Sequence, residues 1–403
     1  MIQTSIAGSL PTAAPESLGL CPQRTRHVIT VLQAEVQRQR LPGAVALIAR
    51  HGKLALFEAV GALDPASAKA MPLDAIFRIY SMTKPIVSVA AMMLMEQGQL
   101  LLSDLVAKYL PEFGAQKVAG LVDGALQLQN VQHGATVHDL LRHTAGLTYE
   151  FMGNAAVQRQ YAQARIGSRT RSNAELSHAL AALPLLFEPG TMWEYSRATD
   201  VLGRVLEVVT GQTLGAYLQE HIFKPLGLID TGFSVPRQHH ERIAEPFAND
   251  PEGGLQMRLI DVRTEGKLES GGGGLVSTAT DYARFLQFML NRGELGGVRL
   301  LAPATVDFMT ADHLGDIAVN SGSSRELLPP GHGFGLGFAV RKQLGLASTP
   351  GSVGAYFWGG MAGTTFFVDP AKDLFACLML QAPNQREYYR MLFRNLVYAT
   401  LIV

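Results

Sequence analysis

Ser81 and Lys84 are the two residues whose types and spacing most directly suggest chemistry. Residues three apart on a helix lie on the same face, so the Ser81 hydroxyl and the Lys84 amine can meet if this segment is helical. A serine hydroxyl is a poor nucleophile that needs a nearby base, and a lysine can be that base only when neutral. Burial, nearby cations and the positive end of a helix dipole all lower a lysine pKa. The pair therefore predicts nucleophilic catalysis by Ser81.

A long apolar helix is expected to carry this pair. The segment 81–97 is rich in apolar residues, and Pro85 can stand in its first turn because no hydrogen bond is lost there. The start of such a helix points backbone N–H groups at an oxyanion that forms beside Ser81. An ordinary helix start is the alternative, since Ser-x-x-Lys alone is common by chance. Its place directly before a hydrophobic helix favours the catalytic interpretation.

Tyr195 is the third candidate, because it stands in a loop just before a predicted helix at 199–209. Near Lys84 its phenol could ionise more readily and act as a base or a proton shuttle. The alternative is a core or surface role, since the chain has 11 tyrosines.

Strand patterns occur at both ends of the chain, with a mostly helical block between them. A helix is predicted at 23–40 and a last one at 387–399. Strand-like segments lie at 44–49, 54–60, 334–340, 354–358, 364–368 and 374–380. The simplest topology is a sheet assembled from both termini around a helical insertion. The segment 270–274, with four consecutive glycines, is expected to be flexible.

Composition and charge exclude several classes of function. The 403 residues include 34 Lys plus Arg and 34 Asp plus Glu, so the formal net charge is zero. A neutral chain without a basic run argues against nucleic acid or an anionic membrane as the main partner. The N-terminus has neither the cationic start nor the apolar stretch of a signal peptide, and the apolar run at 85–95 is too short to span a bilayer. Cys21 and Cys377 are expected to be buried free thiols of a cytoplasmic protein.

Several catalytic motifs are absent. No serine stands in Gly-x-Ser-x-Gly, and neither HExxH nor a P-loop occurs. The cysteines lack the spacing of a zinc site, and the pair His239-His240 is expected in a solvated loop. The sequence therefore gives no reason to expect a metal or an organic cofactor.

Six short motifs in order resemble the serine β-lactamase-related superfamily, and most closely its family VIII carboxylesterases. The motifs are Ser81-x-x-Lys84, His143-Thr-Ala-Gly-Leu147, Pro189-Gly190 with Tyr195-Ser196, Ser270-Gly-Gly-Gly-Gly-Leu-Val-Ser277, His332-Gly-Phe-Gly-Leu-Gly337 and Trp358-Gly-Gly360. The resemblance implies an α+β fold of an antiparallel sheet flanked by helices plus an all-helical domain, with the active site in the cleft between them. The domain boundaries we expect are a loose segment at 1–20, a sheet domain from 21–80 and 210–403, and a mainly helical domain at 81–209.

The resemblance also implies roles for individual residues. Ser81 matches the acylated nucleophile, Lys84 its partner and Tyr195 the catalytic tyrosine. The backbone N–H groups of Ser81 and Met361 would form the oxyanion hole. The motif that begins at His143 would shape a buried loop.

Two departures from the β-lactamase pattern bear on the substrate. Trp358-Gly359-Gly360 stands where β-lactamases have Lys-Thr-Gly, so this strand lacks the cation and hydroxyl that grip a substrate carboxylate. Its indole and bare backbone favour neutral esters. Arg197 replaces an asparagine two residues after the tyrosine, which puts β-lactam turnover in doubt, although it could offer a cation to a carboxylate.

The sequence therefore predicts a serine esterase that hydrolyses short-chain neutral carboxylic esters through an acyl-enzyme. Its partner would be a small-molecule ester, and the oligomeric state stays open. The alternatives are a β-lactamase or D-amino-acid peptidase, an acyltransferase on the same scaffold, and a catalytically silent binding protein, against which Ser81, Lys84 and Tyr195 weigh.

Overall fold

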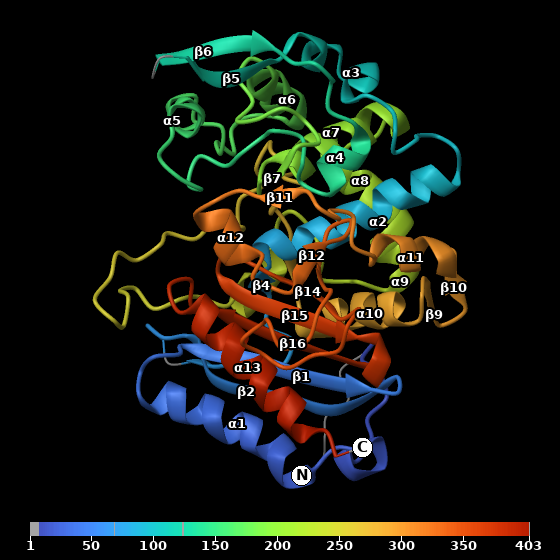
Figure 1. The fold of residues 1–403 in the computed structure, drawn as a ribbon. Helices are drawn as coiled ribbons and strands as arrows, with labels where there is room; N and C mark the ends of the chain where they lie inside the picture. Colours follow the sequence, from blue (N-terminus) through green and yellow to red (C-terminus); the bar gives the residue numbers. More distant parts are fainter. Residues whose placement is uncertain (1–7, 68, 123–124, 403) are drawn as a thin grey trace.

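A computed structural model describes residues 8–67, 69–122 and 125–402 of the chain. An eight-stranded sheet, antiparallel throughout, is assembled from both ends of the chain, and its edge strands are β12 and β3. Its strands, in spatial order, are β12 (His332–Phe334), β13 (Ala339–Arg341), β14 (Tyr356–Gly359), β15 (Gly363–Asp369), β16 (Leu374–Gln381), β1 (Gly43–Arg50), β2 (Lys53–Asp64) and β3 (Lys69–Ala70). Figure 1 shows β1 and β2 from the N-terminal part of the chain beside β15 and β16 from its C-terminal part. The predicted sheet from both termini is confirmed, and the single strand expected at 334–340 is the pair β12 and β13.

The central strands are buried on both faces. In β1, Val45 and Leu47 enter one hydrophobic cluster, while Ala46 and Ile48 enter a second cluster on the opposite face. Successive side chains of a strand point to opposite sides, so a run without polar residues fits a strand covered on both faces. β16 has the same composition and pairs with β1 along its length. The sheet is therefore the middle layer of the fold.

Helices cover both faces of this sheet. α1 and α13 pack together across one face, and α2 and α10 lie on the other, toward the mainly helical part (Figure 1). The helices are α1 (Pro22–Gln37), α2 (Thr83–Glu96), α3 (Val106–Tyr109), α4 (Val137–Leu141), α5 (Ala156–Gln163), α6 (Asn173–Ala181), α7 (Ala198–Thr210), α8 (Leu214–Leu218), α9 (Lys224–Leu226), α10 (Ala279–Leu290), α11 (Pro303–Met309), α12 (Ser323–Leu327) and α13 (Arg386–Thr400). α2 is buried along nearly its whole length, because it packs against α7 as well as within the core below the sheet.

Short strand pairs connect the remaining segments. They are β4 (Phe77–Arg78) with β8 (Val276–Ser277), β5 (Lys117–Val122) with β6 (Ala125–Asn130), β7 (Met192–Trp193) with β11 (Ala318–Val319), and β9 (Glu294–Leu295) with β10 (Val298–Arg299). The pairing of β4 with β8 matters most for the site, because it joins the chain just before Ser81 to the chain just after the glycine-rich segment 270–274.

The described part of the N-terminal segment is packed, which differs from the loose segment expected at 1–20. Leu18 and Leu20 are buried in the cluster between the sheet and α1, and the Ala13 N–H donates to the Leu54 carbonyl at 3.0 Å. Residues 1–7 lie outside the described residues. One hydrophobic cluster also crosses the boundary expected at residue 209, so the domain limits stay a prediction.

Two further features bear on the expectations from the sequence: the burial of the two cysteines and the length and polarity of the helices. Cys377 is buried, but Cys21 is only half-buried, so the prediction of two buried thiols is wrong for Cys21. Within residues 8–67, 69–122 and 125–402, every helix is too short or too polar to cross a bilayer.

Candidate active site

Ser81 lies in a tight turn at the start of α2. A single 3₁₀ turn, Tyr80–Met82, leads into the α-helix, so Ser81 precedes the helix proper, which begins two residues after the expected start. Tyr80 has φ of 43°, a left-handed conformation that is strained for a residue with a side chain. Its hydroxyl accepts a hydrogen bond from the Ile260 N–H at 2.9 Å, which helps to hold the turn. The turn leaves the Ser81 side chain at the wall of a cavity.

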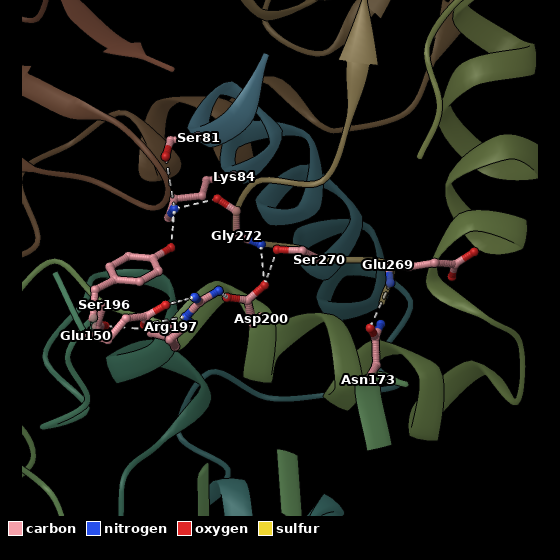
Figure 2. Close-up of polar contacts among 12 residues, drawn as sticks. Ser81, Lys84, Glu150, Asn173, Ser196, Arg197, Asp200, Glu269, Ser270 and Gly272 are labelled. Atoms are coloured by element: carbon pink, nitrogen blue, oxygen red, sulfur yellow. Dashed lines mark hydrogen bonds and ion pairs between the residues drawn. The ribbon is translucent and has the colours of Figure 1, made fainter. Parts of the chain in front are cut away.

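Lys84 is fully buried one turn behind Ser81. Its Nζ lies 3.5 Å from Ser81 Oγ, 3.0 Å from Tyr149 Oη and 2.6 Å from the Gly272 carbonyl oxygen. Figure 2 shows the amine between Ser81 and Gly272. Burial lowers the pKa of Lys84 to about 7, with the positive charge of Arg197 acting in the same direction and Asp200 opposing it. The predicted pair therefore meets, and the amine can lose its proton near neutral pH.

Tyr195 lies beside the same two residues. Its hydroxyl accepts a hydrogen bond from Trp358 Nε1 at 3.3 Å, and the neighbouring Ser81 side chain opposes part of the rise that burial causes in its pKa. Lys84 Nζ lies 4.4 Å from the centre of the tyrosine ring. The expectation that this phenol ionises readily is wrong, because burial raises the pKa of Tyr195. A neutral phenol in this position suits a proton shuttle better than a phenolate base.

Tyr149 is a site residue that the sequence reasoning missed. It is buried, its hydroxyl contacts the Lys84 amine at 3.0 Å, and its ring lies 5.4 Å from the ring of Tyr195. Burial raises the pKa of Tyr149, so it too stays a neutral phenol. The available signal was its position two residues after the His143-Thr-Ala-Gly-Leu147 motif, in which His143 and Gly146 both have positive φ.

Ser81 and Met361, whose backbone amides the resemblance assigns to the oxyanion hole, both line the cavity. Among the described residues, neither N–H donates a hydrogen bond to another protein group. Gly360 and Gly363 hold the turn that contains Met361, since the Gly360 N–H donates to the Thr364 carbonyl at 2.7 Å and the Gly363 N–H to the Gly360 carbonyl at 3.1 Å. The two amides that the resemblance implies are thus available as donors.

The strand Trp358-Gly359-Gly360 forms one side of the cavity, but it is less bare than its sequence suggests. A Cβ on Gly359 would lie 2.6 Å from Arg390 Nε, and a Cβ on Gly360 would lie 2.4 Å from the Ile79 carbonyl oxygen. The glycines therefore make room for neighbouring groups. Arg390 of α13 donates to the Gly360 carbonyl at 2.5 Å and pairs with Glu387 at 2.6 Å. A cation thus reaches this strand from the C-terminal helix.

Arg197 lines the cavity but is held by two carboxylates. Its guanidinium pairs with Glu150 at 2.6 Å and with Asp200 at 3.4 Å, and it lies 4.8 Å from the centre of the Tyr149 ring. Because two carboxylates of the protein already compensate its single positive charge, Arg197 is a weaker candidate for binding a substrate carboxylate than its position in the sequence suggests.

The motif around His143 is buried. The His143 ring packs edge-on against Trp193 and Phe334, and its Nδ1 lies 3.1 Å from Ser196 Oγ. Burial lowers the pKa of His143, so the ring stays neutral. These contacts fit the expected part in shaping a loop beside Tyr195.

The glycine-rich segment is packed rather than flexible, contrary to our expectation. Gly271 and Gly272 are buried, and a Cβ on Gly271 would lie 2.5 Å from the Thr199 carbonyl oxygen. The Leu275 N–H donates to Thr83 Oγ1 at 3.1 Å. The glycines therefore let the backbone approach α2 and α7 closely.

The site opens into a cavity of about 660 Å³. Apolar and aromatic side chains line much of it, among them Tyr149, Phe151, Met152, Leu268 and Trp358. This size and lining suit a small organic ligand. Across the described part of the chain, no three His, Cys, Asp or Glu side chains are grouped so as to hold a metal ion.

Comparison with known proteins agrees with this geometry. A model of the Beta-lactamase family matches residues 28–399. Esterase EstB of Burkholderia gladioli is 35% identical over 369 residues, covering 87% of this chain and 88% of EstB. Lovastatin esterase of Penicillium rubens is 30% identical, covering 88% of this chain and 92% of that protein. The solved structure of EstCE1, a hydrolase with promiscuous acyltransferase activity, is 30% identical and superposes with a TM-score of 0.76 over 93% of this chain and 99% of its own. The chain therefore belongs to the Beta-lactamase family and, within its superfamily, to the family VIII carboxylesterases.

Proposed function

We propose that this protein is a serine esterase that hydrolyses short-chain neutral carboxylic esters through an acyl-enzyme on Ser81. The observation that carries the proposal is the Lys84 amine, buried, with a pKa near 7 and in contact with Ser81. The relatives named as esterases support the same reaction.

Acylation begins with proton transfer from Ser81. Neutral Lys84 takes the hydroxyl proton as Ser81 Oγ attacks the ester carbonyl carbon, forming a tetrahedral oxyanion. The free N–H groups of Ser81 and Met361 donate to that oxyanion. Tyr195, which lies beside Ser81 and Lys84, passes a proton to the alkoxide as the C–O bond breaks, and takes its replacement from the Lys84 ammonium. The alcohol leaves and the acyl group stays on Ser81.

Deacylation repeats these steps with water. The same Lys84 and Tyr195 remove a proton from a water that attacks the acyl carbon, and the collapsing intermediate returns the proton to Ser81 Oγ. The products are the carboxylic acid and the free enzyme, so atoms and charge balance over the cycle. The carbonyl of Gly272 and the hydroxyl of Tyr149 keep the amine aimed at the reacting atoms throughout.

The pH dependence should follow Lys84. Because its neutral form is the base, kcat/KM for p-nitrophenyl butyrate should rise with pH through about 7 and reach a plateau, as the pKa of Lys84 is about 7. Both tyrosines keep their protons over this range, since burial raises their pKa values. The measurement is kcat/KM from pH 5 to 9 with the chemical step rate-limiting. A flat profile would contradict a lysine base.

Substrate choice should favour neutral esters over an anionic β-lactam. Apolar contact with the Trp358 ring stabilises a small acyl or alcohol group by roughly 1–3 kcal/mol. Two of the arginines that line the cavity, Arg197 and Arg390, already hold carboxylates, so an added carboxylate must be desolvated without a free cation from either. We therefore expect kcat/KM for p-nitrophenyl butyrate to exceed clearly that for nitrocefin. The measurement compares nitrocefin with a panel of p-nitrophenyl esters from acetate to laurate. If nitrocefin is preferred by the wild type but not by Arg197→Ala, Arg197 binds the carboxylate and the esterase proposal is wrong.

Acyl transfer is the second candidate function, and the structural neighbour EstCE1 favours it, being described as a hydrolase with promiscuous acyltransferase activity. In this reaction an alcohol replaces water in the second step. Product analysis with vinyl butyrate and added alcohols distinguishes the two, because transfer yields a new butyrate ester and hydrolysis yields only butyric acid.

A further inference from the structure

The direction in which the Lys84 lone pair points depends on two contacts other than the one to Ser81. A neutral lysine amine has two N–H bonds and one lone pair. If the two bonds are directed to the Gly272 carbonyl at 2.6 Å and to Tyr149 Oη at 3.0 Å, the lone pair is left for the Ser81 proton. The contact with Gly272 is the shortest that Lys84 makes, so the position of this peptide controls the orientation of the base.

Asp200 holds the Gly272 peptide. Its Oδ1 accepts the Gly272 N–H at 3.0 Å and also the hydroxyl of Ser270, as Figure 2 shows. Asp200 is 3% exposed and lies in the first turn of α7, five residues after Tyr195. The same short stretch of chain therefore provides the candidate catalytic tyrosine and the anchor for the candidate base.

The approach of this peptide to α7 is as close as the chain allows. A Cβ on Gly272 would lie 2.8 Å from Asp200 Oδ2. The second carboxylate oxygen is also engaged, since Arg197 Nη1 lies 3.4 Å from it. Arg197 is fixed in turn by Glu150, a carboxylate for which no contact with Gly272 is found among the described residues. The Asp200 carboxylate therefore contacts three donors: the Gly272 N–H, the Ser270 hydroxyl and the Arg197 guanidinium. On its other side, the Gly272 peptide presents its carbonyl to Lys84.

We propose that Asp200 is a positioning residue for Lys84, holding the Gly272 peptide in the place from which its carbonyl orients the lysine amine. This inference rests on the serine esterase function proposed above. It assigns a kinetic role to a carboxylate that would otherwise be regarded as an ion-pair partner of Arg197 and an acidic residue at a helix start.

The charge of Asp200 adds a second, separable effect. The titratable and charged groups around Lys84 are Tyr149, Tyr195, His143, Arg197 and Asp200. Burial keeps both phenols and His143 neutral near pH 7, so the acidic limb of the rate profile belongs to the lysine. Asp200 raises the pKa of Lys84 against the larger effect of burial. Removing its charge should therefore move that limb to lower pH.

Two substitutions separate position from charge. Asp200→Ala removes the anchor and the charge, and we expect kcat for p-nitrophenyl butyrate to fall by about tenfold or more with KM little changed, since a misplaced base slows the chemical step. Asp200→Asn keeps an oxygen for the Gly272 N–H, and should recover most of kcat while its acidic limb lies below that of the wild type. Glu150→Gln is the matched control, because its amide oxygen can still accept from Arg197 while a carboxylate charge that does not contact Gly272 is removed; its kcat and acidic limb should match the wild type.

The outcomes are distinguishable. If Asp200→Ala lowers the Tm but leaves kcat and the acidic limb unchanged, the carboxylate is structural and the inference is wrong. If that variant does not fold, Ser270→Ala replaces it: removing one hydrogen bond to Oδ1 should lower kcat modestly with the limb unmoved, and an unchanged kcat overturns the inference. A wild-type protein without esterase activity refutes the proposed function itself, whereas an active wild type with unaltered Asp200 variants refutes only the positioning role.

Discussion

Replacing Ser81 with alanine should abolish ester hydrolysis while the protein stays folded. The hydroxyl is the only group lost, and the candidate nucleophile lies at the cavity wall, 3.5 Å from Lys84 Nζ. Loss of a serine nucleophile costs at least about 10⁴-fold in kcat when the remaining catalytic groups cannot act alone. The measurement is steady-state hydrolysis of p-nitrophenyl butyrate, with thermal unfolding to show that the Tm is preserved.

A covalent probe gives an independent test of the same residue. A p-nitrophenyl alkylphosphonate should release one equivalent of p-nitrophenol and leave its phosphonyl group on Ser81, identified by peptide mass spectrometry. Ser348 lines the same cavity, so Ser348→Ala is the control and should keep both activity and labelling. Activity retained in Ser81→Ala, or labelling at another residue, would show that the nucleophile is misassigned.

Lys84→Ala and Tyr195→Phe should each lower kcat by about 10²-fold or more, as expected for loss of general acid–base catalysis. Because the amine and the phenol pass the same proton to and from Ser81, they act as one unit. The double variant should therefore lose little beyond the more impaired single variant, since effects within such a unit are not additive. The measurement is kcat for the wild type, both single variants and the double variant with p-nitrophenyl butyrate.

Tyr217→Phe is a matched control for the tyrosine. Tyr217 is also buried, but its hydroxyl has no hydrogen-bond partner among the described residues and it does not line the cavity. Its kcat should equal that of the wild type. If the kcat loss of the Lys84→Ala/Tyr195→Phe double variant equals the product of the two single losses, Lys84 and Tyr195 act independently. The proton would then have to follow a different path.

The parts of the fold that could be predicted are those with a strong local pattern. The β1–β2 hairpin, α2 and the C-terminal strands follow from apolar runs of the right length and period bounded by turn residues. The β5–β6 hairpin was missed although β6 has the alternating sequence Leu126-Gln-Leu-Gln129, because its polar residues resemble those of a loop. Alternation alone, without a large apolar face, is a weak signal.

The site divides in a similar way. Ser81 and Lys84 could be paired from helical spacing alone, whereas bringing Tyr195 to them needed the whole fold. Tyr149 and Arg390 could not be placed by local reasoning, because they reach the site from segments far from Ser81 in the sequence. The packing of the glycine-rich segment was missed for the same reason. Four glycines in a row suggest a flexible backbone, and only the positions of the neighbouring helices show that they allow close packing.

The fit between Gly359 and Arg390 has a consequence for how this site could change over generations. The Lys-Thr-Gly strand of β-lactamases carries a side chain at the position of Gly359, where any Cβ would lie 2.7 Å from Arg390 Cζ. To move aside, the guanidinium would have to give up its hydrogen bond to the Gly360 carbonyl and its pairing with Glu387. We therefore expect a threonine at 359 to be unfavourable while Arg390 is present and to be better tolerated once Arg390 has been shortened. We expect the effects of the two changes to depend on each other, so that a selection for β-lactam turnover would gain more from the strand after the C-terminal helix has been altered.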